Sequence, residues 1–203
     1  IICLFTMLLS TTINLVSMFF QTNSILVTWG ITLMLSVCII TPFSMGAKIY
    51  MLEFIRGSEV TVGNVFDGFQ FAIKLIPISI INIASSYLLI YGAELLFSGN
   101  ILFSLLGIIA GVLYLLINII LNFSMYLIYD NDGKIIKSIK DMAVYMLLKG
   151  GIIKFIMLIL SYILWFFGII ISFGLLTFFV LPYMEAARAV FYDDIYTFIR
   201  SGN

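Results

Sequence analysis

The sequence predicts an all-α fold: a polytopic bundle of transmembrane helices. Its composition is 63% hydrophobic and only 10% charged, whereas a soluble domain carries roughly 25% charged residues. Several uncharged apolar runs reach the roughly 18–20 residues that are needed to cross a hydrocarbon core about 30 Å thick. In water, a fold of this composition would expose large apolar surfaces. We therefore predict a single transmembrane domain over residues 1–203.

Six spans account for the apolar runs. We predict them at about residues 1–20, 25–50, 71–97, 101–129, 152–171 and 175–198. Short polar turns connect three pairs of spans, and two longer polar stretches connect the others. Proline near a span end is expected to kink the helix, because it lacks the backbone N–H and clashes with the preceding turn. The prolines concerned are Pro42, Pro77 and Pro182.

Two amphipathic segments in the longer polar stretches are predicted to lie along the membrane surface. The first covers about residues 61–70, where apolar residues recur at helical spacing and Thr61 is the expected N-cap. The second covers about residues 133–149, with lysines on one side of the helical wheel and isoleucine and methionine on the other. Asp130, Asn131 and Asp132 are expected to cap the start of this second helix.

The distribution of basic residues predicts the orientation. All ten Lys and Arg residues fall within 48–74, 130–154 and 188–200. Loops rich in Lys and Arg face the cytoplasm, and here they alternate with uncharged turns at every crossing. Both termini and both surface helices are therefore predicted to be cytoplasmic, in a protein of the cell membrane. A turn at 172–174 is essential, because one helix over 152–181 would place the basic C-terminal region outside.

Polar side chains within or beside the spans are the candidates for a functional site, since ionisable groups at membrane depth often mark ion or substrate pathways. Two acid–base pairs are expected to be either structural ion pairs or functional groups. One pair of asparagines, a helical turn apart, is expected either to join helices by hydrogen bonds or to line a polar path. These residues are Lys48 with Glu53, Glu185 with Arg188, and Asn118 with Asn122.

The basic surface helix has three alternative roles. Its lysines could bind anionic lipid headgroups, dock a protein partner as the coupling helices of transport permeases do, or only anchor the helix on the cytoplasmic side. The candidate contact residues are Lys134, Lys137, Lys140, Lys149 and Lys154.

One internal similarity links two span ends. The segment from Pro42 to Lys48, followed by Glu53, resembles the segment from Pro182 to Arg188, followed by Asp193. Both contain proline, an aromatic residue, two variable residues, a small residue, alanine and a base, with an acid five residues on. The similarity is explained either by duplication, as in transporters built from repeats, or by independent use of the same helix-end chemistry.

Several catalytic classes lack their residues. The chain has no histidine, the commonest general base near neutral pH. Its two cysteines, Cys3 and Cys38, fall within predicted spans and suit apolar packing. Nucleotide-binding loops, nucleophile elbows and zinc-protease motifs are absent from the sequence. No catalytic, metal or cofactor residue, and no nucleic-acid partner, is therefore predicted.

A set of motifs carries a family resemblance. The motifs are Tyr129-Asp130, Lys149-Gly150, Lys154-Phe155, Leu160-Ser161-Tyr162, Trp165, Leu181-Pro182-Tyr183, Phe191-Tyr192 and, in the first half, Arg56-Gly57 and Phe66-Asp67-Gly68-Phe69. The chain resembles a family of bacterial integral membrane proteins, mainly from Firmicutes, that is catalogued as a domain of unknown function. It is also similar to the membrane domain attached to some glycerophosphodiester phosphodiesterases. The resemblance implies a six-span fold and no established activity.

We therefore expect a non-enzymatic membrane protein of scaffold, lipid-contacting or immunity type, with anionic headgroups and a membrane or cytoplasmic protein as partners. The alternative is the permease subunit of a transporter with a separate ATPase. The helix at 133–149 would then be the coupling element, and Asn118, Asn122 and Glu185 would form part of a path.

Overall fold

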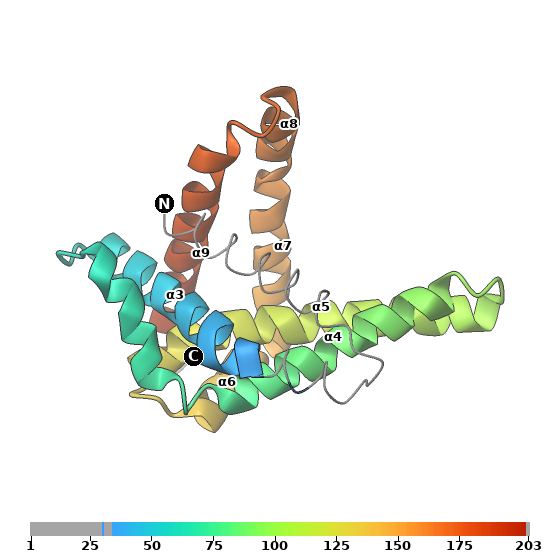
Figure 1. Ribbon diagram of the computed structural model, residues 1–203, viewed down its shortest axis with the longest axis horizontal. Coiled ribbons are helices and arrows are strands. Elements are labelled where there is room, and N and C mark those ends of the chain that lie inside the picture. Colours follow the sequence, from blue (N-terminus) through green and yellow to red (C-terminus); the bar gives the residue numbers. More distant parts are fainter. Residues whose placement is uncertain (1–29, 31–33, 202–203) are drawn as a thin grey trace.

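A computed structural model describes residue 30 and residues 34–201, and all regular elements within them are helical (Figure 1). This confirms the all-α class. The predicted span 1–20 and the start of span 25–50 lie outside the described residues. The elements are the π-helix η1 (Ser36–Ile40), α3 (Thr41–Ile55), the 3-10 helix η2 (Val62–Phe71), α4 (Ile76–Leu96), α5 (Ile101–Asp130), α6 (Ile135–Leu148), α7 (Gly151–Ser161), α8 (Ile163–Ile171) and α9 (Thr177–Arg200).

Within the described residues, four helical segments are long and apolar enough to cross a membrane, which supports a membrane location. They are Ser36–Ile55, Ile76–Leu96, Ile101–Asp130 and Gly151–Ile171. Helix α9 covers most of the predicted span 175–198 but is not among these four. It carries charged side chains in its second half, including Glu185, Arg188 and Asp193.

The core lies where α3, α5, α6 and α9 meet. Residues 121–128 of α5 are buried there with the exception of Asn122, and Tyr126 stacks on Tyr192 of α9 with ring centroids 4.9 Å apart. The first half of α5 is different, because apolar side chains such as Leu105 and Ile109 are exposed along it. In a membrane protein, exposed aliphatic side chains of this kind face lipid.

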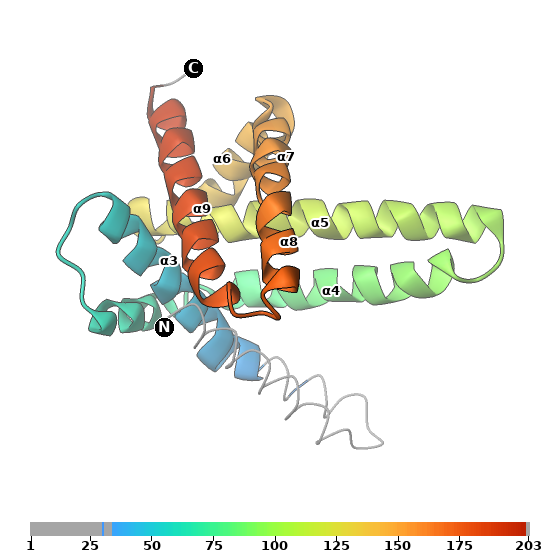
Figure 2. The same cartoon turned by 90° about the horizontal axis from the view of Figure 1, so that it is seen from above.

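Two helical arms extend from this core. One is the α4–α5 hairpin, and the other is formed by α7, α8 and the first half of α9 (Figures 1 and 2). The arms leave the core in different directions, whereas the predicted bundle requires parallel spans. Both arms expose aliphatic side chains along their length. Outside the core, there are therefore few side-chain contacts between the arms that would fix the angle between them.

Small residues bring the two helices of the first arm together. A Cβ added at Gly107 would lie 2.4 Å from the backbone oxygen of Gly92, so only glycine permits this approach. At the tip, the side chain of Asn100 accepts a hydrogen bond of 3.0 Å from the Leu102 N–H. The chain reverses there, which confirms the predicted turn at 98–100.

The first surface segment forms a 3-10 helix rather than an α-helix. Thr61 is its N-cap as predicted, and its backbone N–H donates to Asn64 Oδ1 at 2.9 Å. With three residues per turn, Val65 and Gly68 face α3, while Val62 and Phe66 are largely exposed. The predicted apolar face, based on α-helical spacing, is therefore only partly the buried face.

Close packing fixes this segment against α3. A Cβ at Gly68 would lie 2.1 Å from the backbone oxygen of Pro42, and one at Gly46 would lie 1.6 Å from that of Val65. These contacts occur at the beginning of α3, where Pro42 lies in the first turn and the π-helix η1 precedes it. Pro77 also lies in a first turn, that of α4, where proline introduces no kink. Pro182 is inside α9.

The predicted span 152–171 is divided between α7 and α8. The break falls at Tyr162, which is buried and whose hydroxyl donates to the backbone oxygen of Met184 at 3.3 Å. The chain then reverses at 172–174 with φ values of +51° at Phe173 and +88° at Gly174. This turn confirms that α8 and α9 are separate helices.

The predicted acidic cap of the second surface helix is wrong. Helix α6 begins at Ile135, within the predicted bounds, but its N-cap is Lys134 and no side chain caps it. Asp132 lies in a turn with φ of +55°. Asp130 belongs to the end of α5 and points to a basic side chain from α3, because a charged partner stabilises a carboxylate more than free backbone N–H groups do.

Candidate functional site

Five of the six predicted polar candidates line one cavity. This cavity, which we call the inner polar pocket, has a volume of about 230 Å³ and lies between α3, α5, α7 and α9. Three charged side chains and two amides face apolar and aromatic walls. The lining residues are Lys48, Asn118, Ile119, Asn122, Phe123, Tyr126, Phe155, Glu185 and Arg188.

The charged groups of the pocket come from α3 and α9. The Arg188 guanidinium donates through Nη1 to the Glu185 carboxylate one turn earlier, so this predicted ion pair is present. Lys48 donates to Ser44 Oγ at 3.2 Å, and its ammonium lies 5.8 Å from the centroid of the Tyr126 ring. Two bases and one acid therefore surround the cavity.

The two asparagines are linked to each other and to α4. Asn122 Nδ2 donates to Asn118 Oδ1 at 2.8 Å and to the Asn118 backbone oxygen at 3.0 Å. Asn118 Nδ2 in turn donates to Asn82 Oδ1 at 3.4 Å. The asparagines thus join α5 to α4 by hydrogen bonds and line the pocket at the same time.

The sixth candidate, Glu53, lies elsewhere. Tyr129 donates to its Oε1 at 2.9 Å and Ser58 to its Oε2 at 2.6 Å. Lys48 is five residues earlier on α3, and 3.6 residues per turn place residues at that spacing on different sides of a helix. The expected pair therefore separates, with Lys48 at the pocket and Glu53 in a second polar group.

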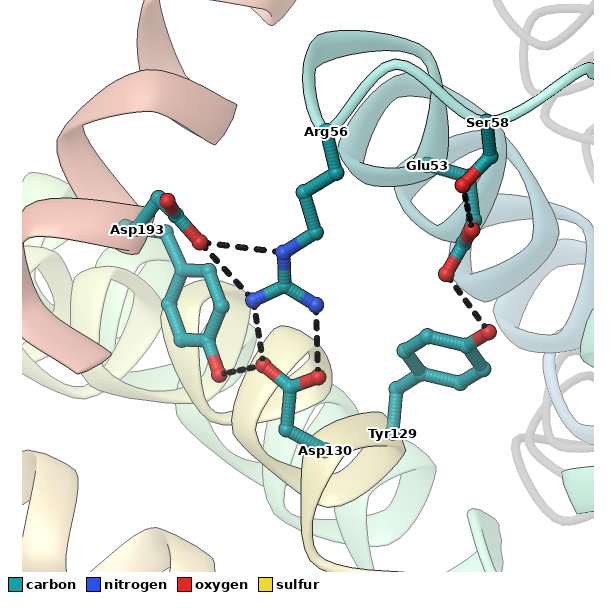
Figure 3. Close-up of polar contacts among 7 residues, drawn as sticks. Glu53, Arg56, Ser58, Tyr129, Asp130 and Asp193 are labelled. Carbon is teal, nitrogen blue, oxygen red and sulfur yellow. Dashed lines mark hydrogen bonds and ion pairs between the residues drawn. The ribbon is translucent and has the colours of Figure 1, made fainter. Parts of the chain in front are cut away.

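This second group, the Arg56 cluster, consists of Glu53, Arg56, Ser58, Tyr129, Asp130, Tyr192 and Asp193 (Figure 3). Arg56 makes a bidentate ion pair with Asp130, with Nη1–Oδ1 and Nη2–Oδ2 distances of 2.8 and 2.9 Å. It also donates to Asp193 Oδ1 from Nε at 3.0 Å and from Nη2 at 2.8 Å. These hydrogen bonds, those to Asp130 above all, raise the pKa of Arg56 above its ordinary value.

The cluster joins three helix segments that are distant in the sequence. Asp130 also accepts a hydrogen bond of 2.6 Å from the Tyr192 hydroxyl, and its side chain is 8% exposed, against 41% for Asp193. The Tyr196 ring lies beneath Arg56 and Arg200, 5.4 and 5.2 Å from their guanidinium carbons. The ends of α3 and α5 are thereby tied to α9.

The sequence contained signals for this cluster. Helix α5 ends in the dipeptide Tyr129-Asp130, and α9 contains the dipeptide Tyr192-Asp193. The aspartate of each dipeptide pairs with Arg56. The internal similarity between Pro42–Lys48 and Pro182–Arg188 also has a spatial counterpart. In each copy the base lines the inner polar pocket and the acid five residues on belongs to the Arg56 cluster.

The predicted lipid-contact lysines are exposed. Four of them belong to α6 or its ends, and their side chains face away from the core; these are Lys134, Lys137, Lys140 and Lys149. Lys74 reaches the same region and donates to the Asp132 backbone oxygen at 3.4 Å. Lys154 is separate: it lines a wide groove of about 790 Å³ between α7 and the end of α9, and Asp194 is also part of that lining.

Residues 34–201 contain no group of three or more acidic or cysteine side chains placed to hold a metal ion. This part of the chain therefore offers charged and hydrogen-bonding groups: a pocket lined by charged and amide side chains, ion pairs around Arg56 and an exposed basic helix.

Comparison of the chain with protein-family models, with curated proteins and with solved structures finds no match. The resemblance to a bacterial membrane-protein family of unknown function therefore stays a prediction.

Proposed function

We propose that this chain is a non-enzymatic integral membrane protein whose cytoplasmic face contacts anionic lipid headgroups through α6. The structure of α6 carries this proposal. Its inner face buries Met142, Tyr145 and Met146 in the core. Its outer face combines exposed lysines with exposed apolar residues, such as Ile136, which is 85% exposed, and Leu148. A helix that exposes both kinds of side chain suits the interface between headgroups and hydrocarbon.

We also propose six spans with both termini in the cytoplasm. The grouping of basic segments supports this orientation. Arg56 contacts one residue in each of the two other basic stretches, Asp130 and Asp193, and Arg200 shares the Tyr196 ring with it. The two described turns that lack Lys and Arg, at 98–100 and 172–174, lie at the far tips of the two arms (Figures 1 and 2). The basic segments 130–154 and 188–200 and Arg56 lie toward the other ends of these arms, a separation of the kind that the positive-inside rule describes.

Headgroup binding is tested with the full chain in nanodiscs, titrated with phosphatidylglycerol against phosphatidylcholine. Near an anionic surface each lysine contributes about 1 kcal/mol, so Lys137→Gln with Lys140→Gln should weaken the preference for the anionic lipid roughly 30-fold. The control is Lys154→Gln with Arg200→Gln, which removes equal charge away from α6 and should leave most of the preference. Equal losses in both variants would exclude a specific role of α6.

Orientation is tested by thiol labelling in intact cells, in a background with Cys3 and Cys38 replaced by serine. An impermeant thiol reagent should modify Asn100→Cys, at the tip of the α4–α5 hairpin, and not Asn131→Cys, beside α6. Protection of Asn100→Cys together with labelling of Asn131→Cys would reverse the proposed topology.

A second candidate function is the permease subunit of a transporter with a separate ATPase. The convergence of Asn118, Asn122 and Glu185 on one cavity favours it, and α6 would be the coupling helix. Purification in mild detergent should then retain an ATPase, and replacing Lys134, Lys137 and Lys140 by Gln should release it. Loss of anionic-lipid preference without any ATPase contradicts this alternative and supports the first proposal.

A further inference from the structure

The wide groove between α7 and the end of α9, which we call the α7–α9 groove, contains one group of each charge. Among the described residues of its lining, the base is Lys154 on α7 and the acid is Asp194 on α9. Both side chains are exposed. Within residues 34–201, neither of them forms an ion pair or a side-chain hydrogen bond. Both charges are therefore available to a ligand that carries a negative and a positive group.

Beyond these two charges, the α7 side of the groove is apolar. Residues three, four and seven positions after Lys154 share its side of the helix, and they are Met157, Leu158 and Ser161. The Ser161 hydroxyl donates to the Leu158 backbone oxygen at 2.6 Å, so it needs no partner in the groove. From α9, Phe191 lines the groove and packs against the core. An acyl chain suits such a surface.

The charged end of the groove lies near the beginning of a predicted membrane crossing. Helix α7 belongs to the segment Gly151–Ile171, which is long and apolar enough to span a membrane. Lys154 is the fourth residue of this segment, about 5 Å from its beginning, and Ser161 lies about 10 Å further along the axis. In the proposed spans, Lys154 and Asp194 therefore lie among lipid headgroups, and the apolar end of the groove lies among acyl chains.

The two charges indicate the kind of headgroup. The Lys154 ammonium suits a phosphate, and the Asp194 carboxylate suits an ammonium that donates N–H hydrogen bonds. Ethanolamine has such an ammonium, whereas choline has no N–H and is typically bound by open aromatic faces. Tyr145 of the groove is only 4% exposed, and its ring packs on Phe198 with centroids 5.3 Å apart, so these two rings are engaged within the protein.

We propose that the α7–α9 groove binds one phospholipid with an ethanolamine headgroup, whose phosphate contacts Lys154 and whose ammonium contacts Asp194. The volume of about 790 Å³ lies within the roughly 300–1,000 Å³ of small-molecule sites, which accommodates a headgroup and the first part of an acyl chain. The site rests on the proposed spans, but it is separate from α6 and takes a different lipid.

Two other occupants match the groove less well. Residues 1–33 contain no Asp, Glu, Lys or Arg, so that segment offers no charged partner to Lys154 or Asp194. A second copy of the chain could pair Lys154 with Asp194 twice across a two-fold axis. Such an axis brings the same surface of both copies together, and it would therefore set one hollow opposite another and leave both unfilled.

The experiment uses the full chain, purified in a neutral detergent and washed of lipid. It is titrated with dioleoyl phosphatidylethanolamine, phosphatidylcholine and phosphatidylglycerol, and bound lipids are counted by native mass spectrometry. The unmodified chain should bind one phosphatidylethanolamine roughly tenfold more tightly than phosphatidylcholine, because only the former donates hydrogen bonds to a carboxylate. Phosphatidylglycerol has no ammonium, and its binding instead measures the anionic preference proposed for α6.

The variants separate the two contacts. Asp194→Asn should reduce the preference for ethanolamine over choline to less than about threefold, whereas Lys154→Gln should weaken both lipids about tenfold and keep their ratio. Met157→Trp, at a position that is 65% exposed, fills the apolar end and should weaken both lipids without disturbing the core. The matched control, Glu59→Gln, removes an exposed carboxylate outside the groove and should leave the ratio unchanged.

Three results would overturn the proposal. One is binding of phosphatidylcholine as tight as that of phosphatidylethanolamine in the unmodified chain. Another is an equal change of the ratio in Asp194→Asn and Glu59→Gln, or unchanged binding in Met157→Trp. The third is a dimer that Lys154→Gln and Asp194→Asn each convert to monomers, since a second copy would then occupy the groove. Failure of the α6 proposal appears separately, as phosphatidylglycerol binding that does not depend on Lys137 and Lys140, and thiol labelling tests the spans.

Discussion

The Arg56 cluster and the inner polar pocket are built from the same kinds of side chain but differ in how these are satisfied. In the cluster, two carboxylates hold one guanidinium, and Nε, Nη1 and Nη2 of Arg56 all donate to carboxylate oxygens. In the pocket, two bases face one carboxylate around an open volume. The Arg56 guanidinium is saturated and joins helices, whereas the charged side chains of the pocket surround a cavity. The buried charge of the first region is therefore expected to contribute more to stability than that of the second.

The largest stability effect is expected in the saturated region. Asp130→Asn keeps the shape of the side chain but removes the charge that Arg56 and Tyr192 both contact. Losing one partner of such a partly buried pair costs about 3 kcal/mol. For a chain of 203 residues this corresponds to a fall in Tm of roughly 6–12 °C, measured by intrinsic fluorescence in detergent.

Asp193→Asn is the matched comparison for that variant. Its carboxylate contacts the same guanidinium but its side chain is 41% exposed, and exposed ion pairs contribute about 0–1 kcal/mol. Its Tm should therefore fall by less than half as much. Equal losses for Asp130→Asn and Asp193→Asn would show that burial does not determine the strength of this joint.

A smaller effect is expected at Tyr192. Its hydroxyl donates to Asp130 Oδ2 at 2.6 Å, and a hydrogen bond to a charged group contributes about 1.5–3 kcal/mol. Tyr192→Phe keeps the stacking on Tyr126 and should lower the free energy of unfolding by about 1.5 kcal/mol, measured by denaturant titration in mixed micelles. Tyr196→Phe keeps its ring beneath Arg56 and should change stability by less than about 0.5 kcal/mol. A larger loss for Tyr196→Phe would contradict the assignment of the hydroxyl bond.

Much of the fold could be predicted from composition and local pattern, and the reasons are physical. Apolar runs long enough to cross a bilayer specify helices, and the polar Asn100 and the Gly174 turn specify reversals. The directions of the two arms could not be predicted, because helices that face lipid expose aliphatic side chains that do not select a neighbour. The close approach of Gly46 and Gly68, which holds η2 against α3, could not be predicted either, because it is a contact between residues far apart in the sequence.

The candidate site could be predicted only in part, from contacts between residues close in the sequence. Spacings of three and four residues placed Glu185 with Arg188 and Asn118 with Asn122, since these are neighbours on any helix. The Arg56 cluster was missed because Asp130 next to a turn matches the local pattern of a helix cap. Its partner, Arg56, is 74 residues away in the sequence, and a contact at that separation leaves no local pattern.

The smallest stability effect is expected at the pocket, where the comparison between the two regions is sharpest. Lys48 lines the pocket together with Arg188, and it donates to the neutral hydroxyl of Ser44 at 3.2 Å. Replacing it with leucine removes a charge that is costly to bury and keeps apolar volume, so the free energy of unfolding should change by less than about 1 kcal/mol in either direction. Proteins commonly keep destabilising groups where they serve binding. The measurement is the same fluorescence Tm as for Asp130→Asn. A loss of stability in Lys48→Leu as large as that in Asp130→Asn would mean that both regions are structural joints, and the distinction between a saturated cluster and an open pocket would then be wrong.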